Sequence, residues 1–214
     1  TTLGVAGIRA PIISGLVLSL NGNGITLSSS LWHRLKLDSA ANTYDPLVTA
    51  QALKAAIDKT DHQLTFASVH NFSTHTLILR PVLSRAGIDP DTDARIIVLP
   101  PEQMVDSLAQ GVIDGFCVGE PWNSIAVEYG AGVLATTGVR LWNGAPDKVL
   151  GVMEHWHGKN PGTHLRLRLA LMEACRWMAN MDNREQAIQI LSQSSYLDLP
   201  AEYLRPSLTG KLFH

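Results

Sequence analysis

The sequence predicts an α/β fold, because short apolar segments alternate with helical patterns from residue 64 onward. The apolar segments cover 64–69, 95–99 and 114–118, and helical patterns follow them at 76–86, 102–110 and 122–129. Short strands rich in β-branched residues and separated by helices are typical of a parallel sheet covered on both faces. We therefore expect a βαβαβα unit in the middle of the chain.

Glycine and proline mark the ends of these predicted helices. Gly87, Gly111 and Gly130 each follow a helical pattern, where a left-handed C-cap is expected. Pro100 and Pro101 open the helix that carries Met104, Val105 and Leu108. These residues support the assigned helices and need no functional explanation.

The flanking segments do not complete a sheet by themselves. Helices are predicted at 25–35, 47–59, 164–178 and 183–192, the last with Asp182 as its N-cap. Such an arrangement fits a sheet domain inserted into another domain, with crossings near Asp61 and Gly158. We expect residues 1–62 to form part of a first lobe, 63–157 a second lobe, and 158–214 a helical return to the first, in a chain truncated at both ends.

Composition excludes several classes of protein. The chain has 214 residues, 45% of them hydrophobic and 17% charged, with a formal charge of −2, and its pI is about 6.4. Direct nucleic-acid binding is not expected, because phosphate backbones select concentrated positive charge. The longest apolar run, at 10–20, is shorter than the roughly 20 residues that span a bilayer.

Enzymatic and metal chemistry find little support. Cys117 and Cys175 have no metal-like spacing, and Cys117, a conceivable nucleophile with His75 as base, lies inside an apolar strand where a thiol usually packs inertly. The sequence contains no nucleophile elbow, Walker loop, zincin motif or dinucleotide fingerprint. His155 and His157 flank Trp156 and leave a metal site open only as an alternative. We predict a protein that is not an enzyme.

Polar residues follow two of the predicted strands at their carboxyl ends. Thr74 and His75 lie where a strand gives way to a helix, whose N-terminus attracts small anions, although simple capping explains the same residues. Gly119 and Glu120 occupy the next such turn, where glycine lets a ligand approach the backbone or merely permits a tight turn. Both turns should face one edge of the sheet, which is where ligands usually bind.

Two further residues are candidates for the same ligand. Lys148 precedes an apolar strand-like run and would supply a point charge for a monovalent anion, or simply be solvated. Asn23, in the turn Asn21-Gly-Asn-Gly24, offers an amide donor, although such turns form without any ligand.

Several motifs resemble the nitrate- and bicarbonate-binding proteins of bacterial ABC transporters and the related nitrate/nitrite sensors of assimilation genes. The resemblance rests on Leu20-Asn-Gly-Asn-Gly-Ile-Thr-Leu-Ser28, Phe72-Ser-Thr-His75, Ala86-Gly-Ile-Asp-Pro-Asp91, Pro100-Pro-Glu-Gln-Met104, Asp114-Gly-Phe-Cys-Val-Gly-Glu-Pro-Trp-Asn123 and Lys148-Val-Leu-Gly151. It covers nearly the whole chain, whereas family members are considerably longer at both ends.

The resemblance implies a two-lobed type II periplasmic-binding-protein fold, with one lobe incomplete, that clamps nitrate or nitrite. It implies ligand roles for His75, Gly119 and Lys148, and an amide role for Asn23. It also implies that the related bicarbonate binders carry an acidic residue at position 148 and recruit calcium. Because Lys148 is basic, we expect nitrate or nitrite, no metal and no cofactor; bicarbonate with calcium, or a sulfonate, is the alternative.

The resemblance leaves open whether the protein is a transporter component or a sensor. A transporter component would be periplasmic or membrane-tethered and deliver its anion to an ABC permease. A sensor would be cytoplasmic and hold an RNA-binding antiterminator protein until nitrate or nitrite releases it. The turn Asn21-Gly-Asn-Gly24 and the form Phe72-Ser-Thr-His75 look more like the sensor branch.

Overall fold

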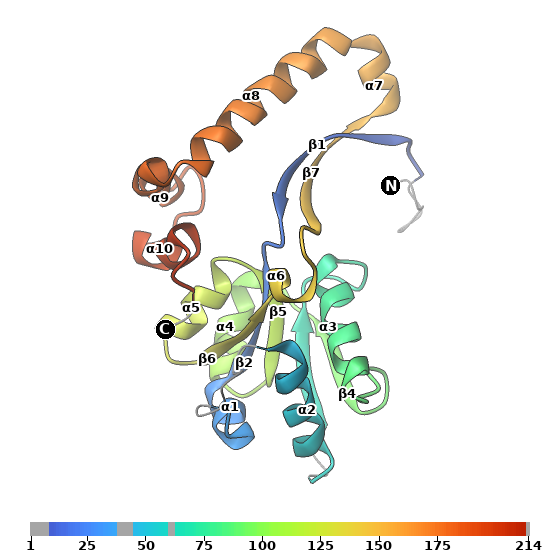
Figure 1. The fold of residues 1–214 in the computed structure, drawn as a ribbon, viewed down its shortest axis with the longest axis vertical. Coiled ribbons are helices and arrows are strands. Elements are labelled where there is room, and N and C mark those ends of the chain that lie inside the picture. The colour runs from blue at the N-terminus through green and yellow to red at the C-terminus, as the bar shows by residue number, and fades with distance from the viewer. Residues whose placement is uncertain (1–8, 38–44, 60–62, 213–214) are drawn as a thin grey trace.

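The structure, a computed structural model, describes residues 9–37, 45–59 and 63–212 and has three connected parts (Figure 1). A five-stranded sheet with helices on both faces forms the sheet unit, which contains residues 23–37, 45–59 and 63–141. A two-stranded ribbon leaves one end of this sheet. The helical arm, residues 154–209, follows the ribbon and turns back to the sheet unit.

The strand order of the sheet is β4-β3-β5-β2-β6. β3 pairs in parallel with β4 and β5, whereas β2 runs antiparallel to β5 and β6. The amino end of β2 therefore lies beside the carboxyl end of β5, with Asn23 opposite Gly119. The strands are β2 (Asn23–Ser28), β3 (Leu64–Ser68), β4 (Ala94–Val98), β5 (Gly115–Gly119) and β6 (Gly132–Thr137).

Helices cover both faces because successive strand residues point to opposite sides. Phe66 and Cys117 join one apolar cluster with helices α1, α2 and α3. Ala67, Phe116 and Val118 join the other with α4 and α5. The helices are α1 (Ser29–Leu35), α2 (Pro46–Ile57), α3 (Thr74–Arg85), α4 (Pro101–Ala109) and α5 (Trp122–Glu128), and the short α6 (Gly138–Leu141) follows β6.

Local sequence signals set the helix ends. Ser73 begins α3 by accepting a hydrogen bond from the Thr76 amide, and Asp45 caps α2 in the same way. Gly87, Gly111 and Gly130 have φ of 78°, 71° and 66°, which confirms the left-handed conformation expected after each helix.

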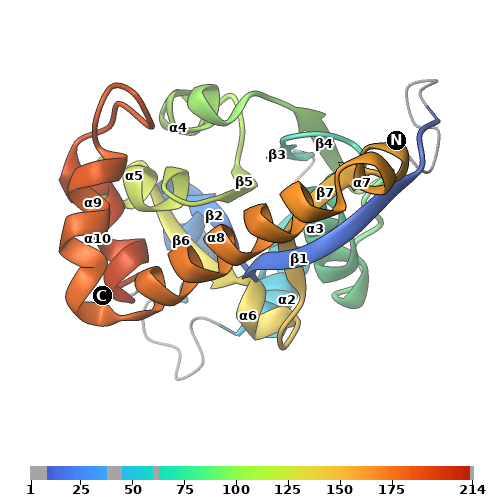
Figure 2. The same ribbon diagram turned by 90° about the horizontal axis from the view of Figure 1, so that it is seen from above.

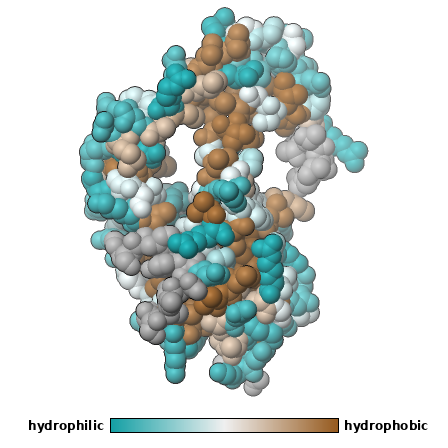
Figure 3. Space-filling model, in the orientation of Figure 1, coloured by the Kyte–Doolittle hydropathy of each residue, from teal (hydrophilic) through white to brown (hydrophobic). Residues whose placement is uncertain are grey.

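The ribbon pairs β1 (Ile12–Leu20) with β7 (Pro146–Met153) in antiparallel fashion. Figure 3 shows apolar side chains gathered along it. The arm contains α7 (Glu154–Lys159), α8 (Pro161–Ala179), a 3-10 turn (Met181–Asn183), α9 (Arg184–Leu191) and α10 (Ala201–Thr209). Seen from above, α8 runs beside β1, and α10 returns to α5 (Figure 2), where the Tyr203 hydroxyl donates to that of Tyr129 at 3.0 Å.

Two expectations about secondary structure need correction. The helix predicted at 25–35 is strand β2 followed by α1; all six residues of β2 are buried, and a fully buried strand lacks the alternation that separates strand from helix. Asp182 lies inside the 3-10 turn, and Asn183 stands at the start of α9.

The predicted lobe boundaries also differ from the structure. Residues 23–37 and 45–57, expected in a first lobe, belong to the sheet unit, because β2 inserts between β5 and β6. The chain enters the sheet unit after Leu20 and leaves it before Pro146, not near Gly158. Asp61, the other predicted crossing, lies outside the described residues.

Candidate functional site

The candidate site lies at the corner where the ribbon joins the sheet. The Asn21 amide donates to the Ala145 carbonyl at 3.1 Å, and the Ala145 amide donates to Asn21 Oδ1 at 3.2 Å. A Cβ on Gly22 would lie 2.8 Å from Asp147 Oδ2, and one on Gly24 would lie 2.8 Å from Leu134 Cδ1. The glycines of the Asn-Gly-Asn-Gly turn are therefore required for close approach.

Asn23 projects a buried amide into this corner, with only 3% of the residue exposed. Its Nδ2 donates to Asp147 Oδ1 at 2.8 Å. Its Oδ1 is buried and meets no donor within the described residues. The β2–β5 pairing sets it beside Gly119, where an added Cβ would lie 3.6 Å from Asn23 Oδ1.

Asp147 is the central residue that the sequence analysis missed. Its side chain is 7% exposed, and its Oδ2 accepts a hydrogen bond from Lys148 Nζ at 2.6 Å, while the Lys148 side chain is 64% exposed. The ribbon aims it inward: Ser19 pairs with Lys148 and Leu20 with Pro146, so Asp147 has no partner on β1. Bulges of this kind redirect side chains. The feature that reveals Asp147 is its packing against Gly22, which has no side chain to block the carboxylate. This contact joins segments far apart in the sequence, so no local motif indicates it.

His75 approaches the corner from α3. Burial and the charge of Lys148 lower its pKa below the ordinary 6.5, while Asp147 acts in the opposite direction, so His75 lies within electrostatic reach of both. Its Nδ1 is buried without a partner in the described part of the chain. Thr74 is half-buried beside it at the first position of the helix.

Glu120, also predicted to bind ligand, is engaged elsewhere. Its Oε2 accepts hydrogen bonds from the Ser124 amide at 3.2 Å and the Ser124 hydroxyl at 2.7 Å. Burial raises the pKa of this carboxyl. The side chain thus turns toward its own helix, although it lines, with Asn23, a hollow of about 780 Å³ that extends to α8 and α9.

Asn123 explains the end of the Phe-Cys-Val-Gly-Glu-Pro-Trp-Asn motif. The Thr26 hydroxyl donates to its Oδ1 at 2.8 Å, and its Nδ2 donates to the Val118 carbonyl at 3.0 Å. The fully buried amide therefore ties β2 and β5 to the start of α5. This bond network holds Gly119 in place.

Alternative chemistries are not supported by the geometry. Cys117 is fully buried, and burial raises the pKa of its thiol far above the ordinary range, which confirms an inert packing role. His155 is exposed, while His157 Nδ1 lies 2.9 Å from His164 Nδ1. Within the described ranges, no three His, Cys, Asp or Glu residues gather as metal ligands.

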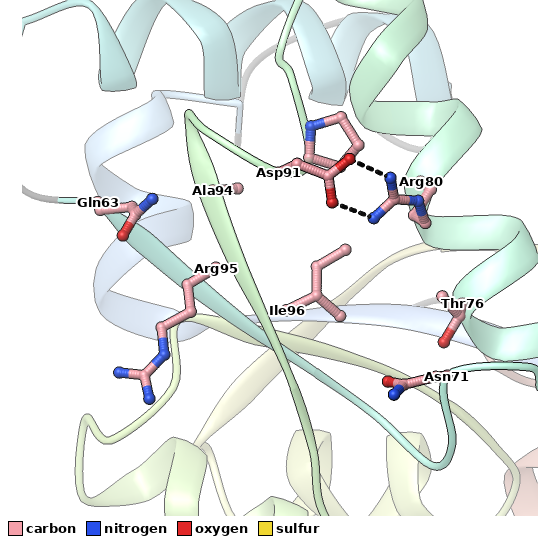
Figure 4. Close-up of a pocket in the computed structure, with 9 residues that line it drawn as sticks. Gln63, Asn71, Thr76, Arg80, Asp91, Ala94, Arg95 and Ile96 are labelled. Atoms are coloured by element: carbon pink, nitrogen blue, oxygen red, sulfur yellow. Dashed lines mark hydrogen bonds and ion pairs between the residues drawn. The ribbon is translucent and has the colours of Figure 1, made fainter.

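A second hollow, of about 580 Å³, follows the edge strand β4 (Figure 4). In it Arg80 forms a two-fold pair with Asp91, with distances of 2.8 and 2.5 Å, while Arg95 extends from β4. Exposed ion pairs contribute little to stability. This hollow contains none of the predicted ligand residues, so it is the weaker candidate for an anion.

No helix in the part of the chain that the structure describes meets the length and hydropathy required to cross a membrane. Even α8, the longest, carries arginines among its leucines.

Comparison with curated proteins finds relatives in nitrate and bicarbonate import. Nitrate import ATP-binding protein NrtC of Synechocystis is 41% identical over 206 residues, which cover 96% of this chain and 29% of NrtC. Bicarbonate transport ATP-binding protein CmpC of Synechococcus elongatus is 40% identical over 202 residues, covering 94% and 29%. Nitrate/nitrite binding protein NrtA of Synechococcus elongatus is 34% identical over 197 residues, covering 91% and 42%.

Comparison with solved structures also finds periplasmic anion-binding proteins among the similar folds. The periplasmic nitrate-binding protein NrtA from Synechocystis superposes with a TM-score of 0.82 at 32% identity, covering 94% of this chain and 50% of that one. The aliphatic sulphonate binding protein SsuA of Escherichia coli, at TM-score 0.63 and 19% identity, shows the fold alone. The chain thus spans 29% to 50% of the length of NrtC, CmpC and the two NrtA proteins, and 59% of SsuA.

These comparisons confirm the predicted resemblance and the α/β periplasmic-binding-protein fold. They also favour a binding protein over an enzyme, since the solved relative NrtA is a nitrate-binding protein. The family match extends over residues 1–192. The chain belongs to the NMT1-like family.

Proposed function

We propose that the chain binds a small oxyanion, nitrate or nitrite first, at the corner formed by Asn23, His75, Gly119 and Lys148. One observation supports this proposal: Asp147 accepts hydrogen bonds from both Asn23 and Lys148, while Asn23 pairs with Gly119 across the sheet. The charges of Lys148 and Asp147 also act on the pKa of His75.

Each residue has a distinct role in this proposal. Lys148 supplies a positive charge on a flexible stem. The N-terminus of α3 and the open backbone at Gly119 supply N–H donors. Thr74 lies beside His75 in position to add a hydroxyl. We propose that the ribbon acts as the hinge of a closing motion that covers the anion.

We propose further that the chain works in an ABC import system, with a permease as partner. The names of NrtC, CmpC and NrtA support this setting. A role as nitrate sensor with an antiterminator partner stays a prediction based on the Asn-Gly-Asn-Gly turn and the form Phe72-Ser-Thr-His75.

Bicarbonate is the second candidate ligand. The negative charge of the buried Asp147 carboxylate opposes nitrate and bicarbonate alike, so charge alone does not choose between them. The similarity to CmpC, named for bicarbonate transport, supports the same alternative.

Calorimetric titration with nitrate, nitrite, bicarbonate and sulfate tests the proposal. Lys148→Glu should weaken nitrate or nitrite binding at least about tenfold, equivalent to about 1.4 kcal/mol. Lys59→Glu is the matched control, because Lys59 is exposed beyond the end of α2. Failure of the protein to bind any of the anions, or equal affinities in the two variants, would contradict the proposed site.

A further inference from the structure

Asp147 makes two hydrogen bonds, and each one restricts a residue of the proposed anion site. Oδ1 accepts from Asn23 Nδ2 at 2.8 Å, and Oδ2 accepts from Lys148 Nζ at 2.6 Å. The carboxylate is almost fully buried in the bulge of β7. A single acidic side chain thus controls the positions of an amide and a charge.

The first bond fixes the orientation of the Asn23 amide. Rotating the amide by half a turn would bring Oδ1 against the carboxylate, placing two acceptors face to face. Rotation would also lose the hydrogen bond from Nδ2 to the buried carboxylate, so the observed orientation is preferred. As a result Nδ2 is occupied, and Asn23 offers the site an acceptor, its unpartnered Oδ1.

The second bond holds the ammonium group of Lys148 against the Asp147 carboxylate. An anion that enters must share the ammonium group with Asp147, and it also meets the negative charge of that carboxylate. Nitrate and nitrite carry only acceptors at neutral pH, whereas bicarbonate carries one hydroxyl donor. Only an anion with a donor can satisfy Asn23 Oδ1 while its other oxygens face Lys148.

We propose that Asp147 is a positioning residue that sets the choice between oxyanions with and without a hydroxyl group. Its hydrogen bond to Asn23 Nδ2 leaves Oδ1 as the atom that Asn23 offers to the ligand. Its hydrogen bond to Lys148 Nζ partly neutralises the positive charge that the ligand meets. This inference rests on the proposed anion site and decides between its two candidate ligands.

Asp147→Asn tests the role, because the new amide can donate to Asn23 Oδ1 and leaves Nδ2 free to face the ligand. We expect nitrate to bind at least about threefold more tightly and the bicarbonate-to-nitrate affinity ratio to fall about tenfold, a change of about 1.4 kcal/mol. Titrations at pH 8 in buffer containing EDTA measure both anions without divalent cations. Asp91→Asn, the same change in the exposed pair with Arg80, should leave the ratio unchanged.

The outcomes separate the two proposals. If the wild-type protein binds neither anion, the proposed function itself fails. If it binds an anion and Lys148→Glu abolishes binding, but Asp147→Asn changes both affinities by the same factor, Asp147 is only structural and the inference is wrong. Bicarbonate binding that requires added calcium also overturns it, because the acceptors then serve a cation.

A second variant protects the test against misfolding. Asn23→Ala removes the acceptor while retaining Asp147 and Lys148. It should weaken bicarbonate more than nitrate, again lowering the ratio. An unchanged ratio in a variant that folds, judged by circular dichroism, would contradict the role assigned to the amide.

Discussion

The sheet unit and the helical arm contain similar apolar side chains but bury them very differently. Leu27, Phe66 and Phe116 in the sheet are fully buried. Leu165, Leu167 and Leu169 in α8 are 53%, 40% and 51% exposed. The sheet unit closes its own core on two faces, whereas the described residues leave α8 largely uncovered. We infer that folding stability resides in the sheet unit, which also holds most of the candidate site.

The largest expected difference between the two regions is in core truncation. Phe116→Ala should lower the free energy of unfolding by about 3–5 kcal/mol, because it empties a closed core. Leu167→Ala should change it by less than about 1 kcal/mol, since the side chain is already partly solvated. Urea unfolding followed by circular dichroism measures both. Equal losses would show that α8 is as tightly packed as the sheet.

A glycine pair sharpens the comparison. Gly24→Ala in β2 should destabilise by about 1–3 kcal/mol, because the new methyl group would lie 2.8 Å from Leu134 Cδ1 and 3.2 Å from Asn123 Cγ. Gly158→Ala in α7 meets no atom within 4 Å and should stabilise by up to about 1 kcal/mol. Thermal unfolding of both variants tests this, and a destabilised Gly158→Ala would contradict it.

The smallest effect concerns pH. Burial and Lys148 lower the pKa of His75 in the folded state below 6.5. The unfolded chain therefore binds a proton first as the pH falls, so the stability contributed by neutral His75 is present above about pH 6.5 and is lost below it, down to the folded-state pKa. Unfolding at pH 7.5 and 5.5 should show a steeper loss in the wild type than in His75→Gln. Identical slopes would mean that His75 is not desolvated in solution.

Local patterns predicted most of the sheet unit, and long-range contacts decided the rest. The alternation after residue 64 placed β3, β4, β5 and their helices within a residue or two. Strand β2 was mistaken for helix because burial on both faces removes its periodicity. The lobe boundary then failed, since it depended on where that strand paired.

The candidate site shows the same division. Asn23, His75, Gly119 and Lys148 were proposed from turn chemistry and a family resemblance, and the structure links Asn23 and Lys148 through Asp147 and pairs Asn23 with Gly119. Asp147 was not proposed from the sequence, because its role depends on its burial against Gly22 and on a bulge in the ribbon. Glu120 was selected from its motif, but its bonds to Ser124 are set by helix geometry that sequence spacing does not reveal.

A crystal structure of the protein with nitrate, and a second with bicarbonate, would test the central claim most directly. We predict anion density within hydrogen-bonding distance of Lys148 Nζ and of the backbone at Gly119, with His75 facing it. Density beside Arg80 and Arg95 in the β4 hollow, with the Lys148 corner empty, would contradict the account.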